Sequence, residues 1–427
     1  MGFGPRFLWG CSTAAYQVEG GNANSAFTAW ERKRGWEPCG TAANSWELWR
    51  EDVRCLQELH ANAYRFSVEW SRVEPHPGVY DEEALKRYAD MARSLRLAGI
   101  RPIVCLHHFS EPAWLFERWP RGWLSDGPLE PFARFVDRTV QALRGEVQDW
   151  ITFNEPMVWL MFGYGNGHFP PGINSLLTME RTFMRGGLID RVAKAHHAAY
   201  KAVHEAVPGA RVSLAQNVAD LEPARADVGD LQATQAWDRF MHSHLLDLAA
   251  SAGTLDFLAL NYYTRVYIRR TPLPLPFHVV PGYGEFEAAV GPRLFRWLGG
   301  RRGDRARTDM GWEVVPEGLG RVALRLWKTY GLPVLVTENG IADSTGLRRE
   351  DFIRDHLAAL AGAMSQGAEV LGYLHWSLVD NYEWGSYAPR FGLYSVDRAH
   401  GFKRARANGA KLFSELAKSN GAILGVH

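Results

Sequence analysis

The chain has 427 residues, of which 46% are hydrophobic and 22% are charged. This composition excludes an intrinsically disordered chain and leaves enough apolar material for a large core. Lys and Arg number 48 and Asp and Glu number 47, so the net charge of +1 creates no general attraction to nucleic acid or to an anionic membrane.

Eight short apolar or β-branched runs are predicted to be strands, separated by longer stretches with apolar residues at helical spacing. The predicted strands are Phe7–Thr13, Ala63–Trp70, Arg101–Phe109, Asp149–Pro156, Arg211–Val218, Phe257–Thr264, Pro333–Gly340 and Val370–Leu378. The predicted helices are Ser45–Ala61, Asp81–Ala98, Leu129–Leu143, Leu188–Val207, Gln232–Ala250, Pro316–Tyr330 and Arg349–Ser365.

This alternation predicts an α/β fold, a single (β/α)8 TIM barrel spanning residues 1–427 with long loops at the C-terminal face. A doubly wound sheet split into two domains is the alternative. The connection over residues 265–311 is longer than a turn and contains a Pro-rich run at 271–276 and an Arg-rich run at 299–305. Because it follows the sixth strand, we expect it to overhang the carboxyl ends of the strands.

Several features predict a cytoplasmic protein. No apolar run approaches the length of about 18 residues that indicates a membrane span, and residues 1–6 lack the pattern of a signal peptide. The four cysteines have no CxxC spacing, so we expect reduced thiols without disulfides or zinc. They are Cys11, Cys39, Cys55 and Cys105.

Active sites of such barrels lie at the carboxyl ends of the strands, so the polar residues that end each strand are candidates. Glu155 and Glu338 each end an otherwise apolar strand, where an ionised carboxylate is costly unless it is paired. An ion pair with Arg65 would explain either residue alone. Two such carboxylates at one barrel mouth indicate glycoside hydrolysis.

The other strand ends carry groups that suit a sugar. Asn, Gln and His side chains exchange hydrogen bonds with hydroxyls, and Trp376 and Trp384 offer rings for pyranose faces. No phosphate loop or dinucleotide fingerprint is present, so we expect no cofactor. We also expect no metal, since His242 and His244 fall in a helical stretch and the adjacent His107 and His108 would point to opposite faces.

At this point six groups of motifs resemble those of the family 1 glycoside hydrolases, the β-glucosidase family of retaining (β/α)8 barrels. The resemblance covers essentially the whole chain, and the set in this order is far more specific than any one motif. The motifs are Phe7–Gly10 with Tyr16–Gly20, Tyr64–Ser67, Thr152–Pro156, Asn261–Thr264, Thr337–Gly340, and Trp376–Trp384 with Arg390–Gly392.

The resemblance implies a retaining, exo-acting β-glycosidase, foremost a β-glucosidase, that acts on a small-molecule β-glycoside or oligosaccharide. Glu155 would be the general acid/base and Glu338 the nucleophile, with Arg65 and Tyr263 holding Glu338 ionised. Asn154 would bind the 2-hydroxyl, Trp376 would lie beneath the sugar, and Trp312 would face the aglycone. The implied substrate-binding residues are Gln17, His108, Asn154, Asn261, Trp312, Trp376, Glu383 and Trp384.

Elementary electrostatics agrees with this division of roles. Glu338 beside Arg65 is expected to have a lowered pKa. Glu155, between Phe153 and Pro156 and facing a second carboxylate, is expected to have a raised pKa. Two carboxyl groups whose pKa values are pushed apart serve as acid and nucleophile.

Two departures from the family pattern leave the preference among glucose, galactose and fucose open. The family usually has His-Trp after the third strand, where this chain has His108-Phe109, and the segment from Glu383 to Arg390 is about one residue shorter than usual. Three alternatives use the same scaffold: a transglycosidase, a 6-phospho-β-glycosidase and an inactive sugar-binding barrel. The phospho-enzymes carry Ser and Lys in place of Glu383 and Trp384.

Overall fold

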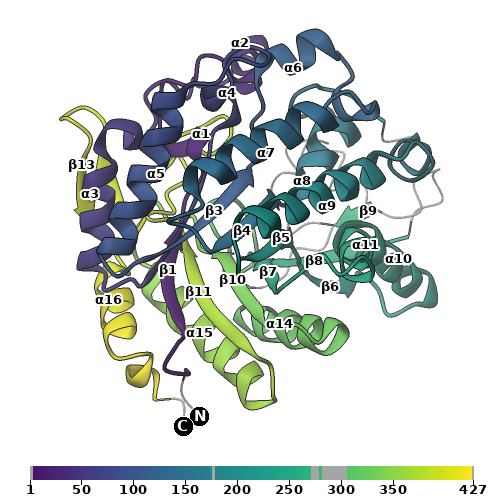
Figure 1. Ribbon diagram of the computed structural model, residues 1–427. Coiled ribbons are helices and arrows are strands. Elements are labelled where there is room, and N and C mark those ends of the chain that lie inside the picture. Colours follow the sequence, from purple (N-terminus) through teal and green to yellow (C-terminus); the bar gives the residue numbers. More distant parts are fainter. Residues whose placement is uncertain (1–2, 176–177, 271–277, 281–304, 426–427) are drawn as a thin grey trace.

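Eight parallel strands close into a barrel (Figure 1), in the spatial order β1-β11-β10-β7-β5-β4-β3-β2. The computed structural model describes residues 3–175, 178–270, 278–280 and 305–425. The barrel strands are β1 (Leu8–Ser12), β2 (Ala63–Ser67), β3 (Arg101–His107), β4 (Asp149–Asn154), β5 (Arg211–Asn217), β7 (Leu258–Asn261), β10 (Val334–Asn339) and β11 (Val370–Trp376). The predicted (β/α)8 barrel is confirmed, and the doubly wound sheet is excluded.

Helices surround the barrel, because each has one apolar face that packs on the strands. They are α3 (Ser45–Glu58), α5 (Glu82–Leu97), α7 (Leu129–Leu143), α9 (Leu188–Ala206), α14 (Pro316–Tyr330), α15 (Arg349–Ser365) and α16 (Ala410–Lys418). The helix predicted at Gln232–Ala250 is instead α10 (Val228–Asp238) and α11 (His244–Ser251), joined by a π-helical turn. Gly331 ends α14 with a φ of 66°, in the left-handed region that glycine adopts readily.

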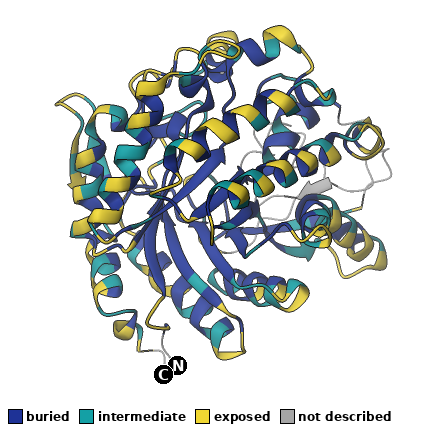
Figure 2. Ribbon diagram, in the orientation of Figure 1, coloured by how far each residue is buried: buried dark blue, intermediate teal, exposed yellow. Residues whose placement is uncertain are grey.

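The core has two layers. Inside the barrel, small and branched side chains such as Ala63, Ile103, Ile151 and Leu335 form one cluster. A larger cluster fills the space between the outer faces of the strands and the helices. Figure 2 shows the barrel strands almost entirely buried, while the helices expose their outer sides. The strands are buried on both faces, which is why their sequences are apolar runs without polar alternation.

The strands end earlier than predicted at the carboxyl side, because the chain there turns into loops and short helices. These helices are α1 (Ala15–Val18), α2 (Ala26–Arg34), α4 (Trp70–Val73), α6 (Ala113–Arg118) and α8 (Pro156–Leu160). Two small sheets were not predicted: β6 (Asp220–Pro223) with β8 (Arg265–Arg269) and β9 (His278–Val280), and the hairpin β12 (Tyr394–Asp397) with β13 (Lys403–Arg406).

Parts of the long connection after the sixth barrel strand, residues 271–277 and 281–304, lie outside the described residues, and with them its Pro-rich run and most of its Arg-rich run. Across the described ranges, no helix is both long and apolar enough to cross a membrane. All four cysteines are buried, and none of them forms a disulfide.

Candidate active site

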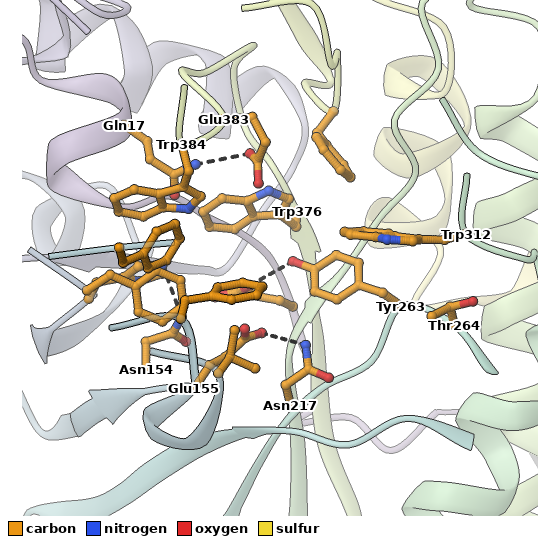
Figure 3. Close-up of a pocket in the computed structure, with 17 residues that line it drawn as sticks. Gln17, Asn154, Glu155, Asn217, Tyr263, Thr264, Trp312, Trp376, Glu383 and Trp384 are labelled. Atoms are coloured by element: carbon orange, nitrogen blue, oxygen red, sulfur yellow. Dashed lines mark hydrogen bonds between the residues drawn. The ribbon is translucent and has the colours of Figure 1, made fainter. Parts of the chain in front are cut away.

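A pocket lies at the carboxyl ends of the barrel strands, the usual position of the active site in a barrel of this type. Polar, carboxyl and aromatic side chains form its wall (Figure 3). Arg65 and Asn261, predicted as site residues, are fully buried behind this wall. The other ten predicted site residues line the pocket: Gln17, His108, Asn154, Glu155, Tyr263, Trp312, Glu338, Trp376, Glu383 and Trp384.

Glu155 lies between β4 and Pro156, the first residue of α8, and its backbone is left-handed with a φ of 41°. Its backbone N–H donates a hydrogen bond of 2.7 Å to the carbonyl oxygen of Ala215 in β5. Phe109 and Trp384, which also line the pocket, have φ values of 68° and 42°. Non-glycine residues in this region carry backbone strain, which is concentrated at functional sites.

Glu338 lies in β10, and each of its carboxyl oxygens accepts a hydrogen bond. Arg65 Nη1 donates to Oε1 at 2.5 Å, and the Tyr263 hydroxyl donates to Oε2 at 2.6 Å. Gly340 follows in the same motif, where an added Cβ would lie 1.8 Å from the carbonyl oxygen of Trp376. The absence of a side chain at Gly340 therefore lets the strand that carries Glu338 pack directly against the strand end that carries Trp376.

The two carboxyl groups differ in their surroundings and in their pKa values. Burial and the neighbouring charge of Glu338 raise the pKa of Glu155 to about 8, which agrees with the expectation. Burial also raises the pKa of Glu338, and Arg65 and Tyr263 oppose this shift without reversing it. The predicted lowering of the pKa of Glu338 is therefore wrong, because desolvation outweighs the ion pair. Among the described residues, Glu338 has a cationic partner and Glu155 has none.

Asn154 fixes the hydrogen-bonding role of His108. Its Oδ1 accepts from Arg65 Nη2 at 2.6 Å and from Asn261 Nδ2 at 3.0 Å. Its Nδ2 therefore faces His108 Nε2, at 3.0 Å, and must donate to it. The proton of His108 consequently lies on Nδ1, which has no partner in the described part of the chain. Burial, with Arg65 and His107, keeps the pKa of His108 well below its usual value, so the imidazole is neutral.

A carboxylate and two indole rings gather on one side of the pocket (Figure 3). Gln17 Nε2 and Asn381 Nδ2 donate to Oε2 of Glu383, at 3.0 and 2.9 Å. Trp376 and Trp384 lie beside this carboxylate. Charged edges beside aromatic faces suit a pyranose ring, whose hydroxyls are polar and whose C–H faces are apolar.

Asn261 lies behind the wall of the pocket. Its Nδ2 donates to Oε1 of Glu155 at 2.8 Å as well as to Asn154, and its Oδ1 accepts from the Thr337 hydroxyl at 2.7 Å. Asn261 is fully buried and does not line the pocket. Its predicted role as a substrate-binding residue does not match this position, because all of its polar atoms face other side chains.

Asn217, at the end of β5, is the main residue that the sequence reasoning missed. Its Nδ2 donates to Oε1 of Glu155 at 3.1 Å, and it lines the pocket. The signal was available, since Gln216 and Asn217 are polar residues that end an apolar strand, as at the other strand ends. Six further lining residues had been given no site role: Phe109, Val158, Phe162, Phe169, Thr264 and Phe391.

Within the described ranges, no group of three or more His, Cys, Asp or Glu side chains is placed to hold a metal ion. His242 pairs with Asp238, at 2.8 Å between Nδ1 and Oδ1. The ring of His107 packs against Phe153 and Trp159, with centroids 5.1 and 4.5 Å away, whereas the next residue lines the pocket.

Comparisons with known proteins agree with this geometry. The family model described as Glycosyl hydrolase family 1 matches residues 2–253 and 246–422. Beta-glucosidase 25 of Oryza sativa subsp. japonica is 30% identical over 484 residues, covering 99% of this chain and 95% of that protein. A beta-galactosidase of Pyrococcus woesei is 29% identical over 513 residues, covering 98% of each. The structure of a beta-glycosidase from Pyrococcus horikoshii has a TM-score of 0.85 at 32% identity, covering 98% of this chain and 95% of that one.

Proposed function

Because the chain belongs to glycosyl hydrolase family 1, we propose that it is a retaining, exo-acting β-glycosidase with Glu155 as the acid/base and Glu338 as the nucleophile. The chain is an enzyme of the class that hydrolyses O-glycosyl bonds. Similar proteins are named as a beta-glucosidase and a beta-galactosidase, so terminal β-D-glucosyl residues are the first proposed substrate and β-D-galactosyl residues the second.

The observation that carries this proposal is that two buried carboxyl groups in one pocket have different hydrogen-bond partners. Glu338 accepts hydrogen bonds from a cation and a hydroxyl, which favour its ionised form. Glu155 receives only amide N–H groups, and its pKa of about 8 keeps it protonated at neutral pH. A nucleophile must be ionised and an acid must carry a proton, so the two surroundings match the two roles.

In the first step, the carboxylate of Glu338 attacks the anomeric carbon while the bond from that carbon to the leaving oxygen breaks. Glu155 gives its proton to the leaving oxygen. The product is a glycosyl ester of Glu338, and the negative charge beside Glu155 has disappeared. The pKa of Glu155 then falls, so Glu155 takes a proton from water as the water attacks the anomeric carbon and returns the electron pair to Glu338.

The remaining wall residues hold the sugar in this proposal. Gln17, His108 and Glu383 bind hydroxyls, as Trp384 does through its indole N–H. Asn154 binds the 2-hydroxyl, where a contact strengthens in the transition state. Trp376 lies beneath the ring, and Trp312 faces the aglycone.

We propose that residues 1–427 act as one catalytic domain, since every barrel strand ends at or near a group of the site. The eight groups, in chain order, are Gln17, Arg65, His108, Glu155, Asn217, Tyr263, Glu338 and Trp376. We also propose that the protein is cytoplasmic, because its four cysteines are buried and form no disulfide.

The proposal is tested by hydrolysing p-nitrophenyl β-D-glucoside and recording the anomeric protons by NMR before mutarotation. We expect β-glucose to appear first, because two inversions retain configuration. Initial formation of α-glucose would contradict the two-step mechanism. The same measurement with the β-galactoside and β-fucoside ranks the sugars, and the α-glucoside is the matched control that should not react.

The pH dependence of kcat/KM should report the proton on Glu155. Because the acid acts only when protonated, kcat/KM for a phenyl glucoside should fall about tenfold per pH unit above pH 8. A dinitrophenyl glucoside needs no protonation of its leaving group, so this fall should be absent for that substrate. Stopped-flow or initial-rate measurements between pH 6 and about pH 10 check this. If kcat/KM fell in the same way for both substrates, the ionisation near pH 8 would belong to a group other than Glu155.

Glu383 should discriminate against phosphorylated substrates. A 6-phosphate would bring a second negative charge next to its carboxylate, and like charges in contact cost several kcal/mol. We expect kcat/KM for a 6-phospho-β-glucoside to be about 10²-fold or more below that for the glucoside. Glu383→Gln keeps the shape of the side chain and removes its charge. The kcat/KM values for the glucoside and the 6-phospho-glucoside should therefore lie closer together in this variant. Comparable rates with both substrates in the unmodified enzyme would contradict the assignment.

A further inference from the structure

Two amide groups converge on one oxygen of Glu155. Asn261 Nδ2 donates to Oε1 at 2.8 Å, and Asn217 Nδ2 donates to the same atom at 3.1 Å. The two asparagines are register partners at the ends of the neighbouring strands β7 and β5. Figure 3 shows the hydrogen bond between Asn217 and Glu155 at the floor of the pocket, where both residues are labelled.

The orientation of Asn261 is fixed by its other contacts. Oδ1 of Asn154 accepts from Arg65, so the Asn261 atom that faces it must be the donor Nδ2, and this same Nδ2 faces Glu155. Oε1 of Glu155 is therefore an acceptor in every protonation state. A carboxylic acid has one carbonyl oxygen and one hydroxyl oxygen, and two N–H donors match the carbonyl oxygen.

We propose that Asn217 is a positioning residue that acts with Asn261 to hold Oε1 of Glu155 as an acceptor, leaving Oε2 as the oxygen that carries the transferred proton. This inference rests on the proposed function, because it concerns the acid/base step of that reaction. Asn217 is half-buried, and the proposed function gives it no contact with the sugar.

Both half-reactions depend on this arrangement. In the first, the O–H bond at Oε2 breaks and its proton passes to the leaving oxygen. In the second, Oε2 accepts a proton from the attacking water. Because Oε1 stays hydrogen-bonded throughout, one oxygen serves as donor and then as acceptor, and the carboxyl group need not rotate between the steps.

Asn217 also affects how tightly Glu155 holds its proton. An N–H donor stabilises the ionised carboxylate more than the neutral acid. Within the described part of the chain, the charged or titratable groups that act most strongly on Glu155 or are acted on by it are Glu338, Arg65 and Tyr263, from β10, β2 and the loop after β7. Glu338 opposes ionisation and Arg65 favours it, and neither contact changes when Asn217 is replaced. The two amides lower the pKa of Glu155 against burial and Glu338.

The test replaces the amide while leaving the carboxyl groups in place. In Asn217→Ala, the basic limb of kcat/KM for a phenyl glucoside should move up by about one pH unit, because a hydrogen bond to a charged group is lost. The acid limb of kcat for a dinitrophenyl glucoside, which is limited by hydrolysis of the glycosyl-enzyme, should move in the same direction by a similar amount. Asn217→Leu, close to the asparagine in size, should give the same shifts.

A double-mutant cycle shows whether Asn217 acts through Glu155. In a Glu155→Ala background, adding Asn217→Ala should change turnover of the dinitrophenyl glucoside by less than about twofold. A structural role would instead lower activity without moving either limb and would add its full loss in that background. Unmoved pH limbs, or a full loss of activity in the Glu155→Ala background, would overturn the inference. Neither result would contradict the proposed function, because the unmodified enzyme would still hydrolyse the glycoside. If the unmodified enzyme hydrolyses no β-glycoside, the proposed function fails first.

Discussion

Glu338→Gly should reduce hydrolysis of p-nitrophenyl β-D-glucoside by about 10⁴-fold or more, as removal of one member of a catalytic unit does in other enzymes. The loss follows because no glycosyl ester forms without the carboxylate of Glu338. Glu155 can still donate a proton to the leaving oxygen, but no nucleophile attacks the anomeric carbon. Steady-state kinetics of the purified variant measures it. Residual activity within about tenfold of the unmodified enzyme would remove Glu338 from the role of nucleophile.

The space left by Glu338→Gly should accept a small anion. Azide or formate at the former carboxylate position, beside Arg65 and Tyr263, can attack the anomeric carbon from the same side. We expect activity to return with a dinitrophenyl glucoside, and the product should be the α-glucosyl azide, which has inverted configuration. Glu338→Gln is the matched control. Its amide fills the space, so it should be equally inactive and azide should not rescue it.

Glu155→Ala should separate the two half-reactions. Loss of a general acid costs about 10²- to 10⁴-fold for a leaving group that needs protonation, such as phenol. A dinitrophenyl leaving group departs without a proton, so the glycosyl-enzyme should still form. Its hydrolysis should then stall because no base activates water. Stopped-flow absorbance should show a burst of dinitrophenolate close to the enzyme concentration, followed by a slow steady state.

The stereochemistry of azide products decides between the two assignments. In Glu155→Ala, azide attacks the glycosyl-enzyme, so the second inversion should give the β-glucosyl azide with retained configuration. Proton NMR distinguishes this product from the α-azide expected of Glu338→Gly. If Glu155→Ala gave the α-azide and Glu338→Gly gave the β-azide, the acid/base and the nucleophile would be exchanged. Glu155→Gln keeps the side-chain volume, so azide should accelerate it less than Glu155→Ala.

Prediction of the fold from sequence succeeded where the signal is local. A strand buried on both faces has an apolar run as its sequence, and a helix packed on it has apolar residues at helical spacing. The eight barrel strands could therefore be predicted in the correct order. The predicted strand ends were wrong by a few residues. At Glu155, for example, the backbone turns to a φ of 41° before α8 begins, and no pattern of side-chain polarity records that turn.

The tertiary structure corrected the account of individual groups. The direction of the pKa shift of Glu338 depends on the sum of desolvation over the whole fold, whereas its neighbour Arg65 was visible from a motif. The small sheet β6-β8-β9 depends on contacts between segments distant in the chain. Sequence patterns describe each segment by itself and therefore miss such contacts.

The sequence by itself determined which chemical groups end each strand: two glutamates, the arginine and tyrosine that partner Glu338, and the polar and aromatic residues of a sugar site. Only the tertiary structure decided how these groups meet. Asn217 and Asn261 lie 44 residues apart in the chain, yet strand register places both amides on the same oxygen of Glu155. Register in a closed barrel is set by packing and hydrogen bonding around the whole ring, so no single segment encodes it.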